Sequence, residues 1–350
     1  MSRIEDVAHA AGVSTATVSR ALRGLPRVSA GTRLRVLEAA ARLDYVASPT
    51  ASSLASGKTR VVGVVVPYVT RWYFANLIAG ASRVLREHGY HVLLLDVGDN
   101  GPERSLLIDQ QMLGKRVDAV LVFQLQLHDV EVELLHRLRI PVVTVGTRSR
   151  RWGRVRIDDV LVAVTATEHL IGLGHTDIAY IGGEPAPQLD FVTPTHRQQG
   201  FVDAMTQRGL AAPAGRLVIS DWTVGGGLGA GRDLLTGAHP PTAIFAASDE
   251  MAMGVLMAAQ RLGVAVPGEL SVIGVDDHDM AASFDLTTVR QDVPEQGEHA
   301  SRLLLGALAA GSDGDENVEV VLATELVVRG STGPPGRGLH GASRDLEQVR

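Results

Sequence analysis

The N-terminal residues constrain the fold of this chain more than any other part of the sequence. Residues 4–11 carry their apolar side chains at the spacing of one helix face, namely Ile4, Val7, Ala8 and Ala11. Gly12 follows directly, and glycine ends many helices because it adopts a left-handed backbone at little cost. The sequence therefore predicts a short first helix that ends at Gly12.

A second short helix is predicted over residues 15–22. The Ser14 hydroxyl can cap its N-terminus. Its apolar residues would pack against the first helix: Val18, Ala21 and Leu22. Its outer face holds small, hydroxylated or cationic side chains: Thr15, Ala16, Thr17, Ser19 and Arg20. Two helices joined by a tight turn with such a face fit the major groove, so the pattern predicts a DNA-binding helix-turn-helix head.

A third helix is predicted to begin after Ser29, which can cap it. Its expected apolar face consists of Leu34, Leu37, Ala40, Ala41 and Leu43. Residues 1–60 hold nine Lys or Arg against four Asp or Glu, whereas the whole chain holds 33 against 39. A basic head on an acidic remainder is the charge distribution expected when the head alone meets phosphate groups.

Residues 47–60 are predicted to connect the head, residues 1–46, to the rest of the chain. Pro49 suits the first turn of a helix and Gly57 its end, which leaves Leu54 as the one large apolar side chain. So short a helix is unstable alone. Leu54 would be buried if it inserted into a base step from the minor groove; the alternative is packing on the body or on a second copy of the chain.

From residue 61 onward, strand-like and helical segments alternate. The expected strands are 61–66, 91–95, 119–123, 142–145, 178–181, 217–219, 243–246 and 272–275. Helical segments lie between most of them, which indicates an α/β architecture with parallel sheets. Such strands could form one barrel or two Rossmann-like lobes, and two lobes are favoured because each half opens with strand, helix and strand.

The two lobes are expected to share the chain between residues 61 and 330. The first would take residues 61–157 and 292–318, and the second would take 158–288 and 319–330. Residues 331–350 are rich in Gly, Pro and Arg and are expected to form a disordered tail.

Several classes of site find no support in the sequence. The chain has no Cys, and its 12 His include no pair at metal-ligand spacing on one helix face. The Gly-rich run 225–231 lacks the lysine of a phosphate-binding loop and is expected to be a flexible loop that enters a helix. The sequence shows no nucleophile elbow, signal peptide or membrane-length apolar run. We therefore predict no catalytic residue, metal or cofactor, and a cytoplasmic protein that does not contact membranes.

From Ile4 to about Gly330, the chain resembles the LacI/GalR (lactose-repressor) family of bacterial transcription regulators. The motifs that carry the resemblance are, in order, IEDVAHAAGVSTATVSRAL, VSAGTRLRVLEAAARLDYVAS, TEHLIGLGHTDIAYIGG, HRQQGF, PPTAIFAASDEMAMG, VPGELSVIGVDD and LTTVRQD. The resemblance implies a three-helix helix-turn-helix head and a two-lobed α/β body like that of periplasmic binding proteins.

The resemblance also implies which residues contact DNA: Ser14, Thr15, Ala16, Thr17, Ser19, Arg20, Arg23, Ser29 and Leu54. Thr15 and Ala16 stand where the family most often sets the operator sequence, and their methyl groups suit a thymine methyl. Arg20 would contact a base or a phosphate. Arg23 departs from the polar residues usual at its position and could add a phosphate contact.

An effector pocket between the lobes is implied in the same way, lined by Tyr73, Phe74, Arg197, Trp222, Ser248, Asp276 and Gln291. Arg197 can give paired hydrogen bonds to vicinal hydroxyls, or it could instead join an inter-helix ion pair. Trp222 offers a flat apolar face to a sugar, or it could belong to the core. Asp276 follows a predicted strand, at the end where open α/β sheets bind ligands. Ser248 replaces an Asn common at its position, and residues 146–148 also depart from the family pattern.

The sequence therefore predicts a homodimeric repressor that binds a palindromic double-stranded DNA operator and responds to a small molecule. A sugar is the first expectation for this effector, and a purine or nucleoside is the alternative. Two other functions are alternatives, and the sequence supports neither. A sugar-binding receptor would predict an export signal and no basic head, and a sugar kinase with a fused head would predict a phosphate loop.

Overall fold

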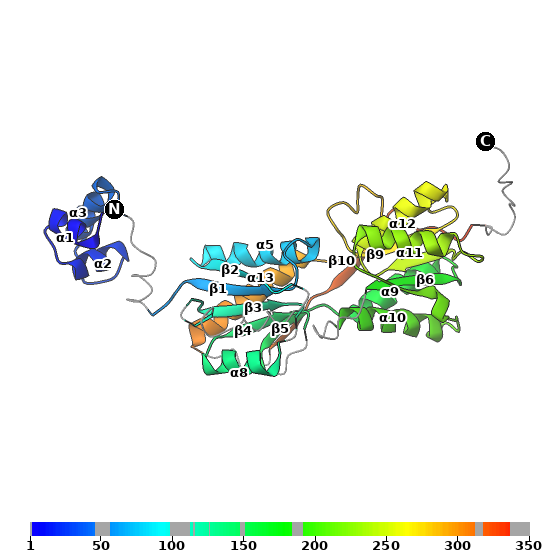
Figure 1. Cartoon of the computed structure of the whole chain (residues 1–350), viewed down its shortest axis with the longest axis horizontal. Coiled ribbons are helices and arrows are strands. Elements are labelled where there is room, and N and C mark those ends of the chain that lie inside the picture. Colours follow the sequence, from blue (N-terminus) through cyan, green and yellow to red (C-terminus); the bar gives the residue numbers. More distant parts are fainter. Residues whose placement is uncertain are drawn as a thin grey trace. The chain divides into compact units, whose positions relative to one another are not determined.

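The computed structural model describes residues 2–45, 57–98, 113–114, 116–125, 127–147, 151–183, 192–311 and 318–336. It contains two compact units, residues 1–61 with 115–118 and residues 62–114 with 119–350. The first unit contains the head, and the second is the two-lobed body (Figure 1). Most of the predicted linker helix, including Leu54, and the expected tail beyond residue 336 lie outside the described residues.

Three helices form the head: α1 (Ile4–Ala11), α2 (Thr15–Leu22) and α3 (Ala30–Arg42). Gly12 ends α1 with a left-handed φ of 64°, as predicted. Ser14 caps α2 by accepting a hydrogen bond from the backbone N of Thr17 at 3.2 Å, and Ser29 caps α3. The three helices meet at fully buried valines: Val7, Val18 and Val36.

The buried face of α3 differs from the prediction. Leu34 and Leu37, placed in the core by the prediction, are 59% and 47% exposed. Ala41 is exposed as well. The helix buries the predicted Ala40 together with Val36 and Ala39, which the prediction did not include. The helices α1 and α2 present small buried residues to this interface, Ala8, Ala11 and Ala21. Close helix approach therefore favours the stripe of small side chains, and spacing alone cannot choose between two apolar stripes on one helix.

The first lobe of the body is built on a six-stranded sheet with the order β11-β5-β4-β3-β1-β2. Its strands are β1 (Val61–Val66), β2 (His91–Asp96), β3 (Ala119–Phe123), β4 (Val142–Val145), β5 (Gly153–Arg156) and β11 (Glu319–Val321). Its helices are α5 (Trp72–Glu87), α8 (Asp129–Arg137) and α13 (Val293–Ala310). In Figure 1, α5 and α8 lie on opposite sides of the strands.

The second lobe repeats this plan with the strand order β12-β10-β9-β8-β6-β7. Its strands are β6 (Ile178–Gly183), β7 (Leu217–Ser220), β8 (Ala243–Ala246), β9 (Ser271–Asp276), β10 (Thr287–Gln291) and β12 (Thr324–Val327). Its helices are α9 (Asp159–Gly172), α10 (Thr193–Gln207), the short 3-10 helix η2 (Ala214–Arg216), α11 (Val224–Leu235) and α12 (Asp249–Leu262). The pairings are parallel except for the antiparallel edge strand β12.

Two lobes, rather than one barrel, are therefore confirmed, but the boundaries need correction. The first sheet includes Glu319–Val321, which pairs with β5, whereas residues 319–330 were expected in the second lobe. The prediction also omits four strands, β5, β10, β11 and β12. Each of these strands carries a charged residue at a half-buried or exposed position, so they lack the continuous apolar run of the central strands.

The Gly-rich run 225–231 is helical, which corrects the expectation of a flexible loop. It forms most of α11, which packs on α12. A Cβ on Gly227 would lie 2.1 Å from the carbonyl oxygen of Met251, and a Cβ on Gly254 would lie 2.2 Å from that of Val224. The two backbones therefore touch, and glycine is required at the contact despite its low helix propensity.

In the part of the chain that the structure describes, no helix combines the length and the apolarity needed to cross a membrane.

The packing of α11 predicts opposite effects of two substitutions on one helix. Gly227→Ala should lower the free energy of unfolding by about 1–3 kcal/mol, because the added methyl overlaps the backbone of α12. Gly229→Ala, where a Cβ would meet nothing within 4 Å, should raise it by about 0.5–1 kcal/mol. Urea denaturation measures the free energy of unfolding of both variants. Changes of the same sign in the two variants would contradict the close packing of α11 on α12.

Candidate functional site

The predicted DNA-contact residues of the head lie on and beside α2. Thr15, Ala16 and Arg20 are exposed, while Thr17 and Ser19 are half-buried. The hydroxyl of Thr17 lies 2.9 Å from that of Ser14. The Nε of Arg23 donates to the carbonyl of Ser19 at 3.1 Å, and the hydroxyl of Ser29 donates to that of Thr32 at 2.9 Å. The arrangement leaves a small, polar and cationic surface on α2, with some of its flanking polar groups engaged locally.

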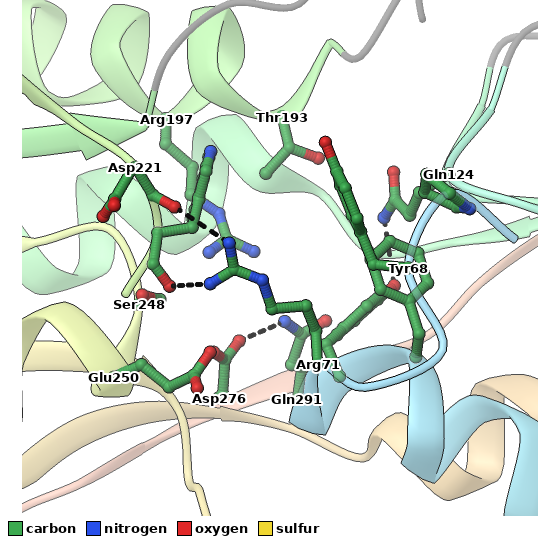
Figure 2. A pocket seen from close by; sticks show the side chains of 14 residues that line it. Tyr68, Arg71, Gln124, Thr193, Arg197, Asp221, Ser248, Glu250, Asp276 and Gln291 are labelled. Carbon is green, nitrogen blue, oxygen red and sulfur yellow. Dashed lines mark hydrogen bonds between the residues drawn. The ribbon is translucent and has the colours of Figure 1, made fainter. Parts of the chain in front are cut away.

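A second candidate site is a cavity of about 780 Å³ in the body, part of it open to solvent. All seven side chains that were expected to line an effector pocket line this cavity: Tyr73, Phe74, Arg197, Trp222, Ser248, Asp276 and Gln291. They come from segments far apart in the sequence and from both lobes (Figure 2).

Seven further lining residues were missed by the sequence analysis: Pro67, Tyr68, Arg71, Gln124, Thr193, Asp221 and Glu250. Three of them directly follow strands, since Pro67 comes after β1, Gln124 after β3 and Asp221 after β7. The rule that ligands bind at the carboxyl ends of strands could have found these three. The sequence offers no comparable signal for Arg71, because its place at the cavity becomes clear only once the order of the strands is known.

Arg197 forms the inter-helix ion pair that was considered for it and also lines the cavity. Its Nε donates to Oδ1 of Asp159 at 2.8 Å, and its Nη1 donates to the carbonyl of Ala247. Thr193 donates to the second carboxylate oxygen of Asp159 at 3.2 Å. Burial opposes the charge on Arg197, but Asp159 and Asp276 hold its pKa above the ordinary value. The ion pair thus fixes a charged donor at the cavity wall.

Asp276 is the last residue of β9, and its side chain is buried. Gln291 donates to its Oδ1 at 2.5 Å (Figure 2). Burial raises the pKa of Asp276 to about 6, with Glu250 acting in the same direction and Arg197 against it. The neighbouring Asp277 instead pairs with Arg329 at 2.6 Å, so the two aspartates have different surroundings.

Among the described residues that line the cavity, carboxylates outnumber guanidinium groups. Asp221, Glu250 and Asp276 line it together with Arg71 and Arg197. Burial raises the pKa of the Glu250 carboxyl, and Arg71 opposes that shift. Because Arg197 already pairs with Asp159, the cavity offers more hydrogen-bond acceptors than free cationic donors.

The first turn of α5 contacts the second lobe across the cavity mouth. The guanidinium of Arg71 donates to the backbone carbonyls of Asp221 and Trp222, at 3.4 and 3.3 Å (Figure 2). The indole Nε1 of Trp72 donates to Asp279 at 3.1 Å, and its ring lies 4.6 Å from that of His278. These contacts join the two lobes.

Three lining residues have a left-handed backbone: Gln124 with φ 48°, Trp222 with φ 63° and Asp276 with φ 123°. Each such conformation costs on the order of 1–3 kcal/mol in a non-glycine residue and occurs preferentially at functional sites. Gly146 has φ 76°, and a Cβ there would lie 2.2 Å from Nε2 of Gln124. Glycine at this departure from the family pattern therefore makes room for the Gln124 amide.

Ser248 caps α12, because its hydroxyl accepts a hydrogen bond from the backbone N of Met251 at 3.3 Å. Behind it, the buried Asp249 accepts hydrogen bonds from the hydroxyl of Thr288 at 2.7 Å and from the backbone N of His278 at 2.8 Å. Nowhere in the described ranges do three or more His, Asp or Glu gather in a group that could hold a metal ion.

The raised pKa of Asp276 predicts a pH-dependent cost to stability. Between its unfolded pKa of about 3.9 and its folded pKa of about 6, the folded state binds more protons, so this contribution to stability falls as pH rises. At about pH 7.5, Asp276→Asn should therefore raise the free energy of unfolding by about 1–3 kcal/mol, and at about pH 4 it should change little.

Urea denaturation at the two pH values measures the effect of Asp276→Asn. Asp233→Asn is the control, because the side chain of Asp233 is 70% exposed and should show no such pH dependence. An effect of Asp276→Asn that is equal at both pH values would contradict a raised pKa of Asp276 in the folded state.

Comparisons with known proteins agree with this architecture. Residues 3–48 match the model of the bacterial regulatory proteins, lacI family, and residues 167–332 match that of a periplasmic binding protein-like domain. Catabolite control protein A of Priestia megaterium is 35% identical over 305 residues, which cover 86% of this chain and 91% of the relative. The HTH-type transcriptional repressor CytR of Escherichia coli (strain K12) is 33% identical, covering 94% and 96%.

Two solved structures extend the match to almost the whole chain. The lac repressor dimer bound to operator and the anti-inducer ONPF is 26% identical with a TM-score of 0.83, covering 95% of this chain and 99% of that one. The complex of the transcriptional regulator CelR with cellobiose is 31% identical with a TM-score of 0.70, covering 95% and 100%. The chain therefore belongs to the lacI family of bacterial regulatory proteins and is a DNA-binding transcriptional regulator.

Proposed function

We propose that the chain is a homodimeric repressor whose affinity for a palindromic operator is controlled by a small molecule bound in the cavity between the lobes. The main support is the cavity itself. Seven residues that were chosen from the sequence, between positions 73 and 291, line one space to which both lobes contribute. A ligand there would contact both lobes at once and could favour one arrangement of them.

The head would read DNA with the exposed face of α2. Thr15 and Ala16 would contact base edges, and Arg20 would contact a base or a phosphate. Ser14, Thr17, Ser19, Arg23 and Ser29 would position the head on the backbone. Leu54, which lies outside the described residues, would insert into the minor groove when two linker helices pair in the dimer.

The chemistry of the cavity favours a sugar over an anion. Trp222, Tyr73 and Phe74 supply apolar faces, and three carboxylates supply acceptors for hydroxyl groups. Those carboxylates would repel a phosphate group. The buried guanidinium of Arg197, which could attract it, is already paired with Asp159. A purine or nucleoside is the alternative effector. We also expect a cytoplasmic protein without catalytic turnover, because the relatives are named as regulators.

A DNA selection experiment tests the head. Full-length protein should enrich a palindrome from a random double-stranded pool. On that sequence, Arg20→Ala should weaken binding by about 10- to 100-fold, which corresponds to the loss of one base or phosphate contact. Arg42→Ala, on the exposed side of α3, is the matched control and should bind as the wild type does. Equal losses in the two variants would argue against α2 as the reading helix.

A melting-temperature panel tests the effector class. Cellobiose, ribose and ribose 5-phosphate are each added in excess to the full-length protein. At least one neutral sugar should raise the melting temperature by several degrees, as expected for binding to the folded state, and the phosphorylated sugar should not. Stabilisation by the phosphate ester alone would contradict the charge argument.

A further inference from the structure

A series of hydrogen bonds runs along the cavity wall from one lobe to the other. In the first lobe, Nε2 of Gln124 donates to the hydroxyl of Tyr73 at 3.0 Å, and that hydroxyl donates to Oε1 of Gln296 at 3.3 Å. Gln296 then donates through Nε2 to Oε1 of Gln291 at 2.9 Å. Gln291 donates to Asp276 in the second lobe at 2.5 Å.

These hydrogen bonds all run in one direction, because every donor points toward Asp276. A carboxylate accepts but does not donate, so it is the natural end of such a series. Burial raises the pKa of Tyr73, which keeps its hydroxyl protonated and able to donate. The direction also fixes the amide of Gln124, whose Nε2 is engaged and whose Oε1 receives no hydrogen bond from any described residue.

Gln296 is the member that transmits this direction from the Asp276 end of the series to Tyr73. It lies on α13, it is 1% exposed, and it is not among the residues that line the cavity. Its amide is the link between Tyr73 and Gln291, since it accepts from the first and donates to the second. A buried amide of this kind cannot exchange its partners for water without cost.

We propose that Gln296 is a positioning residue that sets the polarity of the effector site. By transmitting the direction that the Asp276 carboxylate imposes, it lets two acceptors face the same ligand, Oε1 of Gln124 from the first lobe and the carboxylate of Asp276 from the second. The site then selects a ligand that carries hydrogen-bond donors, such as hydroxyl or amino groups, at both of these points. The statement about the ligand rests on the proposed function, whereas the chain of hydrogen bonds does not.

The same hydrogen bonds can also form with every donor and acceptor exchanged, so the series of hydrogen bonds has two states. If Asp276 were protonated, it could donate to Gln291, and the amides of Gln291, Gln296 and Gln124 would each turn over. Gln124 would then offer Nε2 instead of Oε1 to the cavity. The protonation state of Asp276 in the second lobe is thereby linked to the amide group that Gln124 of the first lobe offers to a ligand.

The titration of Asp276 in the full-length protein, without ligand or DNA, tests this link. Its carboxyl carbon is followed by NMR in wild type, Gln296→Met and Tyr73→Phe. The charged groups that face Asp276 are unchanged in all three: Arg197, Glu250, Asp159 and Asp249. Gln207→Met, at the exposed end of α10, is the control for a surface Gln.

Loss of Gln296 should raise the proton affinity of Asp276 by about threefold or more, because Gln291 is no longer held with its amide N–H toward the carboxylate. Tyr73→Phe, which removes a group that has no hydrogen bond to Asp276, should act in the same direction. Its effect should disappear when Gln296→Met is already present. The Gln207→Met control should titrate as the wild type does.

Two results would overturn the proposal: a wild-type titration of Asp276 in Gln296→Met, or additive effects of the two substitutions. Gln296→Asn, which keeps an amide but shortens it, provides a second variant if Gln296→Met does not fold and should shift the titration in the same direction. Binding of cellobiose by calorimetry, expected about tenfold weaker in Gln296→Met, is a separate arm. If cellobiose fails to bind the wild type, that result counts against the proposed effector class, while the titration still decides the role of Gln296.

Discussion

The buried ion pair between Arg197 and Asp159 is the interaction on which the cavity depends. Arg197 is 4% exposed, and an isolated charge in such surroundings would cost several kcal/mol. Asp159 and the carbonyl of Ala247 compensate that cost and also hold α9, α10 and the end of β8 together. The carboxylate of Asp276 is a second group that favours the charge on Arg197. The cavity wall is therefore built from charged groups that are already balanced, which leaves Asp276, Glu250 and Asp221 available to a ligand.

The sequence predicts much of the fold because periodicity and end signals agree in most elements. The bounds of α2 follow from Ser14 and the apolar spacing, and the central strands are apolar runs that parallel sheets bury on both faces. Predictions fail where tertiary packing decides. Spacing does not reveal that α3 buries Val36 rather than Leu34, because the choice depends on the small residues of α1 and α2. The composition of residues 225–231 suggests a loop, while contact with α12 makes the same residues a helix.

The candidate site was foreseen in part. Residues carried over from the family resemblance meet at one cavity, although their roles in binding stay predictions. Resemblance could not supply Gln124 or Gln296, whose importance appears only when hydrogen-bond partners from both lobes are seen together. The same holds for Arg71, because its backbone partners at Asp221 and Trp222 are 150 residues away in sequence. Interactions across the lobes are the part of the site that sequence patterns do not report.

A ligand bound between the lobes should control the DNA affinity of the head. The most direct measurement is operator affinity of the full-length protein with and without a neutral sugar that stabilises it, in wild type and in Arg197→Lys. A lysine keeps the charge but cannot bridge Asp159 and a ligand with a planar fork. The sugar should change operator affinity by about tenfold or more in wild type and much less in the variant. An equal response in both proteins, or no response in the wild type, would contradict this control.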